Sequence, residues 1–164
     1  MRLSDLFDQL TDFESQIEGI VRIVGAISAD IGELQIDNVQ TDHRNVDSSS
    51  VFVALVGNQI NSHAFIPDAR RNGAKYVIGQ LDATSIVEAD LLVGNSRAII
   101  GPMASVLEGF PSRKMSLVGI TGTNGKTSVS YLYSAMVQEQ KSHCFTMGTT
   151  GILLNGEKEA DSQT

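Results

Sequence analysis

The stretch 116–136, SLVGITGTNGKTSVSYLYSAM, constrains the fold of this chain more than any other. An apolar run, a glycine-rich turn, a lysine and a hydroxyl residue follow one another without a gap. This order predicts a strand over 116–120, a loop over 121–126 and a helix from about 127 to 140. A second strand is predicted over 144–147. We expect the two strands to be parallel, because a helix joins them.

A loop between a buried strand and the start of a helix directs several backbone N–H groups at one point, where the helix dipole adds partial positive charge. Such a loop is suited to hold a nucleotide phosphate. Gly122 and Gly125 would let the backbone approach phosphate oxygens without a Cβ in the way, and Asn124 tolerates unusual backbone angles. Lys126 would reach the β- and γ-phosphates of ATP, and the hydroxyl of Thr127 would complete the coordination of Mg²⁺.

The predicted contacts to the ATP phosphates are Gly122, Thr123, Asn124, Gly125, Lys126, Thr127 and Ser128. The general pattern G-x-x-x-x-G-K-[ST] would place a glycine at position 120, where this chain has Ile120. The loop is therefore a variant of that pattern. The alternative is an ordinary strand–turn–helix with a solvated Lys126.

Composition argues against several classes of protein. Apolar residues make up 41% of the chain, which suits a packed globular core. The net charge of −7 disfavours a general nucleic-acid binder, which would be basic. Cys144 is the single cysteine, so neither an intramolecular disulfide nor a cysteine-rich metal site is possible. The acidic N-terminus lacks a long apolar run, which favours a cytoplasmic protein without a signal peptide or a membrane span.

Before residue 111 the chain alternates strand-like and helix-like segments, which predicts an α/β layer architecture. Ser4 is expected to cap a short helix that buries Leu6, Phe7 and Leu10. Strands are expected over 20–27, 51–56, 76–79 and 91–94, and helices over 65–71 and 96–110, the latter capped by Ser96. Pro111–Lys114 interrupts the pattern, so we predict one domain over 1–111 and a second, incomplete one over 112–164. The acidic segment 156–163 is expected to be a solvated loop.

Several stretches resemble the Mur ligase family. TGTNGKTS, residues 121–128, resembles the phosphate loop of these enzymes. Residues 41–79 resemble the first domain of the MurE and MurF members, whose pattern reads roughly D-S-R, G-D-L-F-V-A-L-x-G, D-G-H-x-F-I and A-x-x-x-G-A-x-x-V. The matching residues are Asp42-His43-Arg44, Ser49-Ser50-Val51-Phe52-Val53-Ala54-Leu55, Asn61-Ser62-His63-Ala64-Phe65-Ile66 and Gly73-Ala74. Gly148-Thr149-Thr150-Gly151 resembles a G-T-x-G segment typical of MurE, so the chain is most similar to that branch of the family.

The resemblance implies a MurE/MurF-type N-terminal UDP-binding domain, followed by the first strand, phosphate loop, helix and strand of a central ATP-binding domain. Such enzymes add a diamino acid to UDP-MurNAc-L-Ala-D-Glu in peptidoglycan precursor synthesis. ATP activates the substrate carboxylate as an acyl phosphate, which the amine attacks. Lys126 would be catalytic, because its charge offsets the repulsion between the carboxylate and the γ-phosphate. The implied contacts to the UDP-sugar are Thr41, Asp42, His43, Arg44, Asn58, Gln59 and Ile60, with Thr164 near the substrate carboxylate.

The sequence departs from the family pattern near the implied UDP contacts. His43 stands where the family has serine, and Ser49-Ser50 stands where it has Gly-Asp, so that UDP affinity would be altered or lost. An alternative for Asp42–Arg44 is a polar turn held by an Asx hydrogen bond. His63 matches a family histidine, although a lone histidine in a loop is more often a surface residue or a local hydrogen-bond partner.

The chain resembles only the first domain and the beginning of the second. We therefore expect no ligase turnover from it alone, and the remainder of the ligase is the implied partner. Residues 113–164 are expected to be marginally stable alone, or to borrow packing from the first domain or another chain. A second hypothesis is a truncated paralogue that binds a UDP-sugar without chemistry. A MurF-type ligase is disfavoured by residues 148–151, and an unrelated phosphate-loop NTPase by residues 42–78. The diamino acid stays open, because its pocket belongs to a domain that this sequence lacks.

Overall fold

The structure is a computed structural model, and it describes residues 1–16, 23–24, 29–57, 60–81 and 89–160. The chain divides into two compact units, Met1–Met115 (unit 1) and Ser116–Thr164 (unit 2). The domain boundary expected from the sequence, between residues 111 and 112, falls within a short 3₁₀ helix, Pro111–Lys114, near the end of unit 1.

Unit 1 is built on a five-stranded sheet with the strand order β1-β5-β4-β3-β2. The strands are β1 (Ile23–Val24), β2 (Asn38–Gln40), β3 (Ser50–Val53), β4 (Tyr76–Gln80) and β5 (Leu91–Val93). Strands β2 to β5 run parallel, and β1 pairs antiparallel with β5. The helices are α1 (Leu3–Gln16), α2 (Ala29–Gly32), α3 (Ile66–Arg71) and α4 (Ser96–Leu107). The predicted α/β architecture is confirmed.

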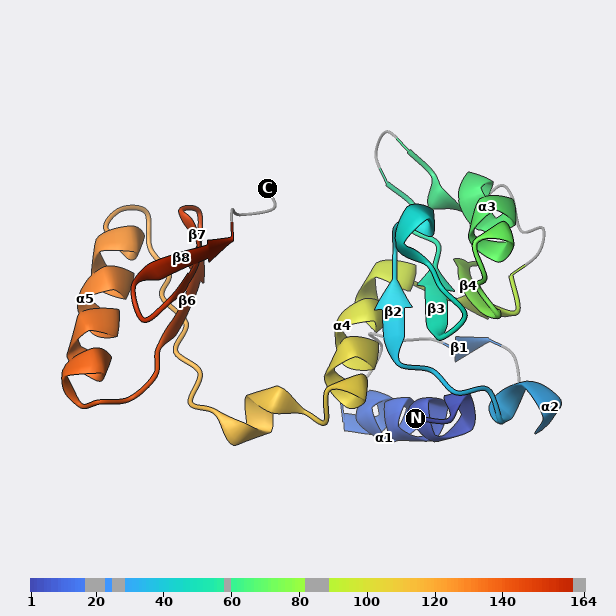
Figure 1. The fold of residues 1–164 in the computed structure, drawn as a ribbon, viewed down its shortest axis with the longest axis horizontal. Coiled ribbons are helices and arrows are strands. Elements are labelled where there is room, and N and C mark those ends of the chain that lie inside the picture. The colour runs from blue at the N-terminus through green and yellow to red at the C-terminus, as the bar shows by residue number, and fades with distance from the viewer. Residues whose placement is uncertain (17–22, 25–28, 58–59, 82–88, 161–164) are drawn as a thin grey trace. The chain divides into compact units, whose positions relative to one another are not determined.

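Two apolar cores lie on the two faces of this sheet. Figure 1 shows the helices α1, α3 and α4 that surround the sheet. Val51 and Val53 belong to one core, which they share with residues of α1 and α4. Phe52 and Ala54 belong to the other, which they share with Ile66 and other residues of α3. Successive side chains of a strand point to opposite faces, so the apolar run 51–54 contributes to both cores.

At the beginning of unit 1, the predicted buried residues are confirmed, but the predicted helix cap is wrong. Leu6, Phe7 and Leu10 are buried, as predicted. Ser4 is not the cap, because α1 already begins at Leu3. The chain just before the helix is held by pairing, since Arg2 forms an isolated antiparallel bridge with Gln35. Of the expected strand over 20–27, Ile23–Val24 is a strand, and the remaining positions lie outside the described residues.

Helix α4 also begins with a different cap from the one expected. The side-chain Oδ1 of Asn95 accepts from the amides of the first turn, so Asn95 is the cap. Ser96 is fully buried and bonds to the side chain of Gln80. The helix ends at Leu107, earlier than expected, because Gly109 and Phe110 adopt positive φ angles of 67° and 55°.

Unit 2 differs from the sequence prediction at its beginning. Residues 116–120 form neither a strand nor a helix, so the strand predicted there is wrong. Leu117 and Val118 are 70% and 53% exposed. A strand needs a neighbour for its N–H and C=O groups, and no strand in the described part of the chain pairs with this segment. Helix α5 (Lys126–Glu139) then follows, which confirms the predicted helix.

Three strands follow α5 and form an antiparallel sheet in the order β6-β7-β8. They are β6 (Phe145–Gly148), β7 (Gly151–Leu154) and β8 (Glu157–Ala160). The predicted parallel pair is therefore wrong, and part of the segment expected to be a solvated loop is a strand. The parallel pair is absent because residues 116–120 form no strand beside β6. The strand replaces the expected loop because Asn155 and Gly156 have φ angles of 51° and 85° and supply the left-handed backbone of a two-residue hairpin turn.

Candidate functional site

Helix α5 begins without a side-chain cap. Its N-cap is Gly125 with a φ of 77°, and Gly122 has a φ of 148°. Both angles favour glycine, so the two residues permit the turn of the loop. An amide hydrogen bond runs from the Val129 N–H to the Gly125 oxygen at 2.9 Å. The amides of residues 126–128 therefore precede the helical ladder, and amides in this position are suited to bind an anion.

Lys126 is exposed and folds back onto its own loop. Its Nζ donates to the Gly122 oxygen at 2.5 Å and to the Thr123 oxygen at 3.3 Å. Contact with a phosphate would require the ammonium group to exchange these carbonyl oxygens for charged phosphate oxygens, which form stronger hydrogen bonds with a cation. The cation is therefore held within the loop that precedes α5, and its contact with phosphate stays a prediction.

The loop offers one fitting ligand for magnesium. The hydroxyl of Thr127 belongs to an exposed residue in the first turn of α5. Mg²⁺ in proteins is usually held by a few protein oxygens together with water and substrate phosphates. Across the described residues, no three or more His, Cys, Asp or Glu side chains gather into a group that would hold a metal ion. The hydroxyl oxygen of Thr127 is a donor of the kind that Mg²⁺ accepts, and its role as a ligand stays a prediction.

The predicted UDP contacts begin with the turn after β2. Asp42 caps a 3₁₀ helix, His43–Asn45, and its Oδ1 accepts from the Arg44 N–H at 3.0 Å. The Arg44 guanidinium also donates to both carboxylate oxygens, with Nη2 to Oδ2 at 2.6 Å. These hydrogen bonds hold the pKa of Asp42 well below its usual range. The segment is thus an Asx-type turn in which the charge of Arg44 is balanced by Asp42, as the alternative interpretation expected.

His43 is anchored on both its side chain and its backbone. Its ring stacks on Phe65, with the centroids 4.5 Å apart and the planes inclined by 13°. Its carbonyl oxygen accepts from the Asn72 side chain at 2.8 Å. Sequence reasoning did not identify Phe65 or Asn72 as neighbours of this turn, and no local pattern connects positions so far apart in the chain. The histidine that replaces the family's serine is therefore built into the fold by an aromatic contact.

Ser49 and Ser50 form part of a second polar turn. The Asp47 carboxylate accepts from the Ser49 N–H at 2.8 Å, from the Ser49 hydroxyl at 2.9 Å and from the Ser50 hydroxyl at 2.8 Å. These bonds lower the pKa of Asp47. Ser50 is fully buried, and its hydroxyl also accepts from the Asp47 N–H. The two serines that replace the family's Gly-Asp thus find their hydrogen-bond partner nearby, in Asp47, at the start of β3.

The sheet topology brings those predicted UDP contacts that the structure describes to the same end of the strands. β2 and β3 are adjacent and parallel, so the segments after them leave the sheet at the same edge. In open α/β sheets, ligands bind outside the carboxyl ends of the strands. Thr41–Arg44 follows β2, and Ile60 lies in the segment after β3 with its residue 62% exposed. Asn58, Gln59 and Thr164 lie outside the described residues.

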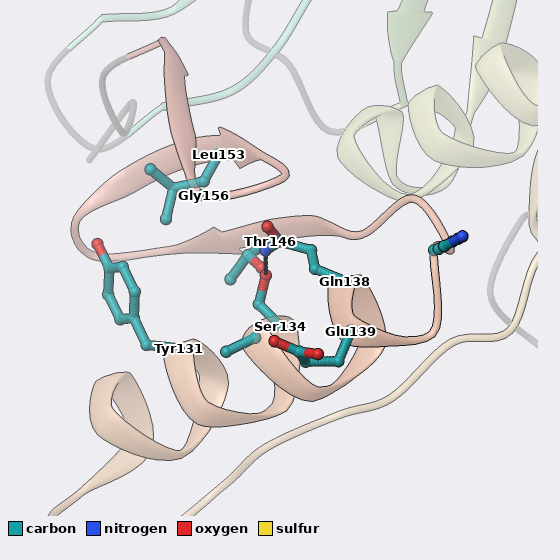
Figure 2. Close-up of a pocket in the computed structure, with 9 residues that line it drawn as sticks. Tyr131, Ser134, Gln138, Glu139, Thr146, Leu153 and Gly156 are labelled. Atoms are coloured by element: carbon teal, nitrogen blue, oxygen red, sulfur yellow. Dashed lines mark hydrogen bonds between the residues drawn. The ribbon is translucent and has the colours of Figure 1, made fainter.

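A pocket of about 580 Å³ lies between α5 and the following hairpin (Figure 2). Ser134 and Gln138 of α5 and Thr146 of β6 line it, and Gln138 Nε2 donates to the Ser134 hydroxyl at 3.0 Å. The predicted phosphate contacts over 122–128 do not line this pocket. It is a gap in the packing of α5 on the sheet, separate from the phosphate loop.

No family model matches the chain. Known proteins do match it over most of its length. It is 31% identical over 166 residues, 99% of this chain, to a UDP-N-acetylmuramoyl-L-alanyl-D-glutamate–2,6-diaminopimelate ligase of Alkaliphilus metalliredigens. It is 28% identical over 146 residues, 88% of this chain, to a UDP-N-acetylmuramoyl-L-alanyl-D-glutamate–L-lysine ligase of Staphylococcus aureus. A solved structure of a UDP-N-acetylmuramoyl-L-alanyl-D-glutamate–2,6-diaminopimelate ligase matches 79% of this chain with a TM-score of 0.62 and 26% identity.

The chain is a homologue of the Mur ligases. The resemblance found in the phosphate loop and in residues 41–79 is thereby confirmed. The chain spans 30% of the length of the Alkaliphilus ligase and 29% of the Staphylococcus ligase. The names of these two ligases specify different amino acids, 2,6-diaminopimelate and L-lysine. The similarity therefore does not tell which amino acid this chain would use. No helix in the described part of this Mur ligase homologue is long and apolar enough to cross a membrane.

Proposed function

We propose that this chain is the N-terminal part of an ATP-dependent amide ligase that adds a diamino acid to UDP-MurNAc-L-Ala-D-Glu in the synthesis of peptidoglycan precursors. The observation that carries the proposal is the 31% identity to a Mur ligase over 99% of the chain. In this role unit 1 binds the UDP part of the substrate, and the loop before α5 binds the phosphates of ATP. The cytoplasm, which holds ATP and nucleotide sugars, is the compartment in which such a protein would act.

The reaction would proceed in two steps. The substrate carboxylate attacks the γ-phosphorus of ATP, which forms an acyl phosphate and releases ADP. The amine of the diamino acid then attacks the acyl carbon, loses a proton and releases phosphate.

The chain's own contribution would be electrostatic. A carboxylate and a triphosphate repel each other as they approach. Lys126 and the amides of residues 126–128 would offset that repulsion. A magnesium ion, with Thr127 as one ligand, would supply further positive charge to the phosphates. Thr41, His43, Arg44 and Ile60 would hold the UDP part, so that the carboxylate is presented to the ATP site.

Binding without turnover is the expected behaviour of the chain alone. Calorimetric titration with Mg-ATP and with UDP-MurNAc-L-Ala-D-Glu measures the two sites, and a coupled ATPase and amide-formation assay measures turnover. Lys126→Ala is expected to weaken Mg-ATP binding only, and the exposed Lys114→Ala in unit 1 is the matched control. If the chain bound neither ligand, the proposal would be contradicted. Clear turnover would contradict the expectation that catalysis needs the remainder of the ligase.

A UDP-sugar binding module without chemistry is a second candidate. It is favoured by the two apolar cores of unit 1. All the residues given for these cores belong to unit 1 itself. The same titrations separate the two candidates. A binding module would bind the UDP-sugar and not Mg-ATP, and Lys126→Ala would change neither result.

A further inference from the structure

His63 is a buried histidine, 3% exposed, between a turn and the end of β4 in unit 1. Its Nε2 lies 2.8 Å from the Gln80 backbone N–H, which can only donate. Its Nδ1 lies 2.7 Å from Asn61 Oδ1, an oxygen that accepts. Nε2 must therefore accept and Nδ1 must carry the proton. Both ring nitrogens are thus satisfied only when the ring is neutral and in this tautomer.

The turn on one side of the ring carries Ile60. The Gly57 N–H donates to the Ile60 oxygen at 3.0 Å, and Val56 forms an antiparallel bridge with Asn61. A Cβ at Gly57 would lie 2.7 Å from the Ile60 oxygen, so the backbones of Gly57 and Ile60 approach closely. Asn61 Oδ1 also accepts from the His63 N–H at 3.1 Å. The turn that presents Ile60 is therefore tied to His63 through one side-chain oxygen.

The other side of the ring is tied to the carboxyl end of the sheet. Gln80 is the last residue of β4, and its Oε1 accepts from the Ser96 N–H at 3.1 Å and from the Ser96 hydroxyl at 3.2 Å. The ring also lies against Gly79, where a Cβ would be 3.3 Å from His63 Nε2 and 3.0 Å from the Ala89 Cβ. Hydrogen bonds thus link the turn to His63 and His63 to the Gln80 backbone, while the Gln80 side chain bonds to the start of α4.

We infer that His63 is a positioning residue for the UDP-sugar: its neutral ring holds the turn that carries Ile60 against the carboxyl edge of the sheet, and protonation of the ring releases that turn. The inference rests on the proposed function, which counts Ile60 among the UDP contacts.

An added proton must go to Nε2, where it would face the Gln80 N–H. Two donors then oppose each other, and the hydrogen bond is lost. Burial lowers the pKa of His63, and no charged side chain contributes to that shift. The two hydrogen-bond partners of the ring, the Asn61 side chain and the Gln80 backbone, are uncharged, and so is Gly79 beside Nε2. The ring is therefore neutral near pH 7 and gains a proton only in more acidic solution.

The test compares the Kd for UDP-MurNAc-L-Ala-D-Glu near pH 7.5 and near pH 5.5, a range in which a histidine can titrate. The full chain is expected to bind severalfold more weakly at the lower pH. His63→Gln is expected to remove that dependence, because its amide oxygen can accept from Gln80 and does not titrate. His143→Gln, at an exposed residue of unit 2, is the matched control and is expected to keep it. His43→Gln measures whether the other histidine of unit 1 contributes.

Three results would count against specific claims. No binding of the UDP-sugar at the higher pH would contradict the proposed function itself. Binding with the same loss at low pH in His63→Gln as in the parent chain would overturn the positioning role. Near-UV circular dichroism without ligand must show unit 1 folded at the lower pH. A collapse of that signal would mean that the weaker binding reflects unfolding, and the inference would fail.

Discussion

The two units of this chain bury their apolar residues very differently. In unit 1, Phe52, Tyr76 and Ile78 are among the side chains that are almost wholly inaccessible to solvent. In unit 2, Leu132, Met136 and Met147 are 67%, 66% and 72% exposed, and Leu153 is the buried apolar residue among those described. Unit 1 thus has well-buried apolar cores, whereas most of the large apolar side chains described in unit 2 are exposed.

Layer architecture explains the difference. The sheet of unit 1 has helices on both faces, so each apolar face meets a partner. Over its described residues, 116–160, unit 2 has a single helix, α5, beside a three-stranded sheet. Val129, Leu132 and Met136 are spaced as one face of that helix and are all exposed. The described elements of unit 2 therefore leave this face of α5 unburied.

The largest expected effect tests the buried cores of unit 1. Phe52→Ala in β3 is expected to destabilise unit 1 by about 3–5 kcal/mol, since it removes a fully buried aromatic side chain and leaves a cavity. Leu132→Ala in α5 is expected to change the free energy of unfolding by about 0.5 kcal/mol or less. Urea denaturation followed by circular dichroism measures both. Equal losses in the two variants would show that the contrast between the units is wrong.

The next effect concerns binding by unit 2. Lys126→Ala is expected to weaken Mg-ATP binding by about 10- to 100-fold, because a charged hydrogen-bond donor to phosphate is worth about 1.5–3 kcal/mol. The unfolding of unit 1 should be unchanged, since Lys126 bonds to carbonyl oxygens of its own loop. Calorimetry and denaturation of the same preparation report the two quantities. A shift in the denaturation midpoint of unit 1 would mean that the units are not energetically independent.

A smaller effect concerns pH and the turn before β3. Hydrogen bonds from Ser50 and Ser49 lower the pKa of Asp47 in the folded state. The unfolded chain therefore binds a proton at higher pH than the folded chain does. The stabilisation from Asp47 is present above the ordinary pKa of about 3.9 and is lost as the pH falls through the folded value. Between about pH 5 and pH 3, the parent chain should lose more stability than Asp47→Asn. Urea denaturation across this range measures both proteins. Equal losses of stability in the parent chain and in Asp47→Asn would show that the Asp47 turn does not cause the pH dependence.

The smallest expected effect on stability concerns the exposed face of α5. Leu132→Gln combined with Met136→Gln should change the free energy of unfolding by less than about 0.5 kcal/mol. The same pair should reduce concentration-dependent self-association, because it removes two exposed apolar side chains. Sedimentation velocity at several concentrations measures this. Strong destabilisation instead would show that the face is already buried in solution.

Much of the fold could be predicted because its signals are local. β3, β4 and β5 appear as short apolar runs, and α5 appears directly after a glycine-rich turn. The β7–β8 hairpin also has a local signal, the pair Asn155-Gly156, which the prediction of a solvated loop overlooked. The strand expected over 116–120 failed for the opposite reason. An apolar run becomes a strand only beside a partner, and the partner is not encoded in the run.

The two candidate sites also differ in whether their signals are local in the sequence. The phosphate loop is one continuous segment, so its residues could be named from the sequence, and their contacts with ATP remain a prediction. The edge of unit 1 is assembled from separate segments. His43 stacks on Phe65, and His63 accepts a hydrogen bond from Gln80. Neither pair is close in the sequence, so neither neighbour could be identified before the strands were placed side by side.

The amino-acid sequence by itself determined the turn of the loop before α5, through the glycines at positions 122 and 125, and the apolar runs that became β3 to β5. Each of these depends on backbone freedom or on the hydrophobicity of a few consecutive residues. Only the tertiary structure decided that Ser96 is a buried partner of Gln80 and that His63 is neutral with both nitrogens engaged. Burial and hydrogen-bond geometry depend on what the rest of the chain brings to a side chain, and that is decided when the layers pack.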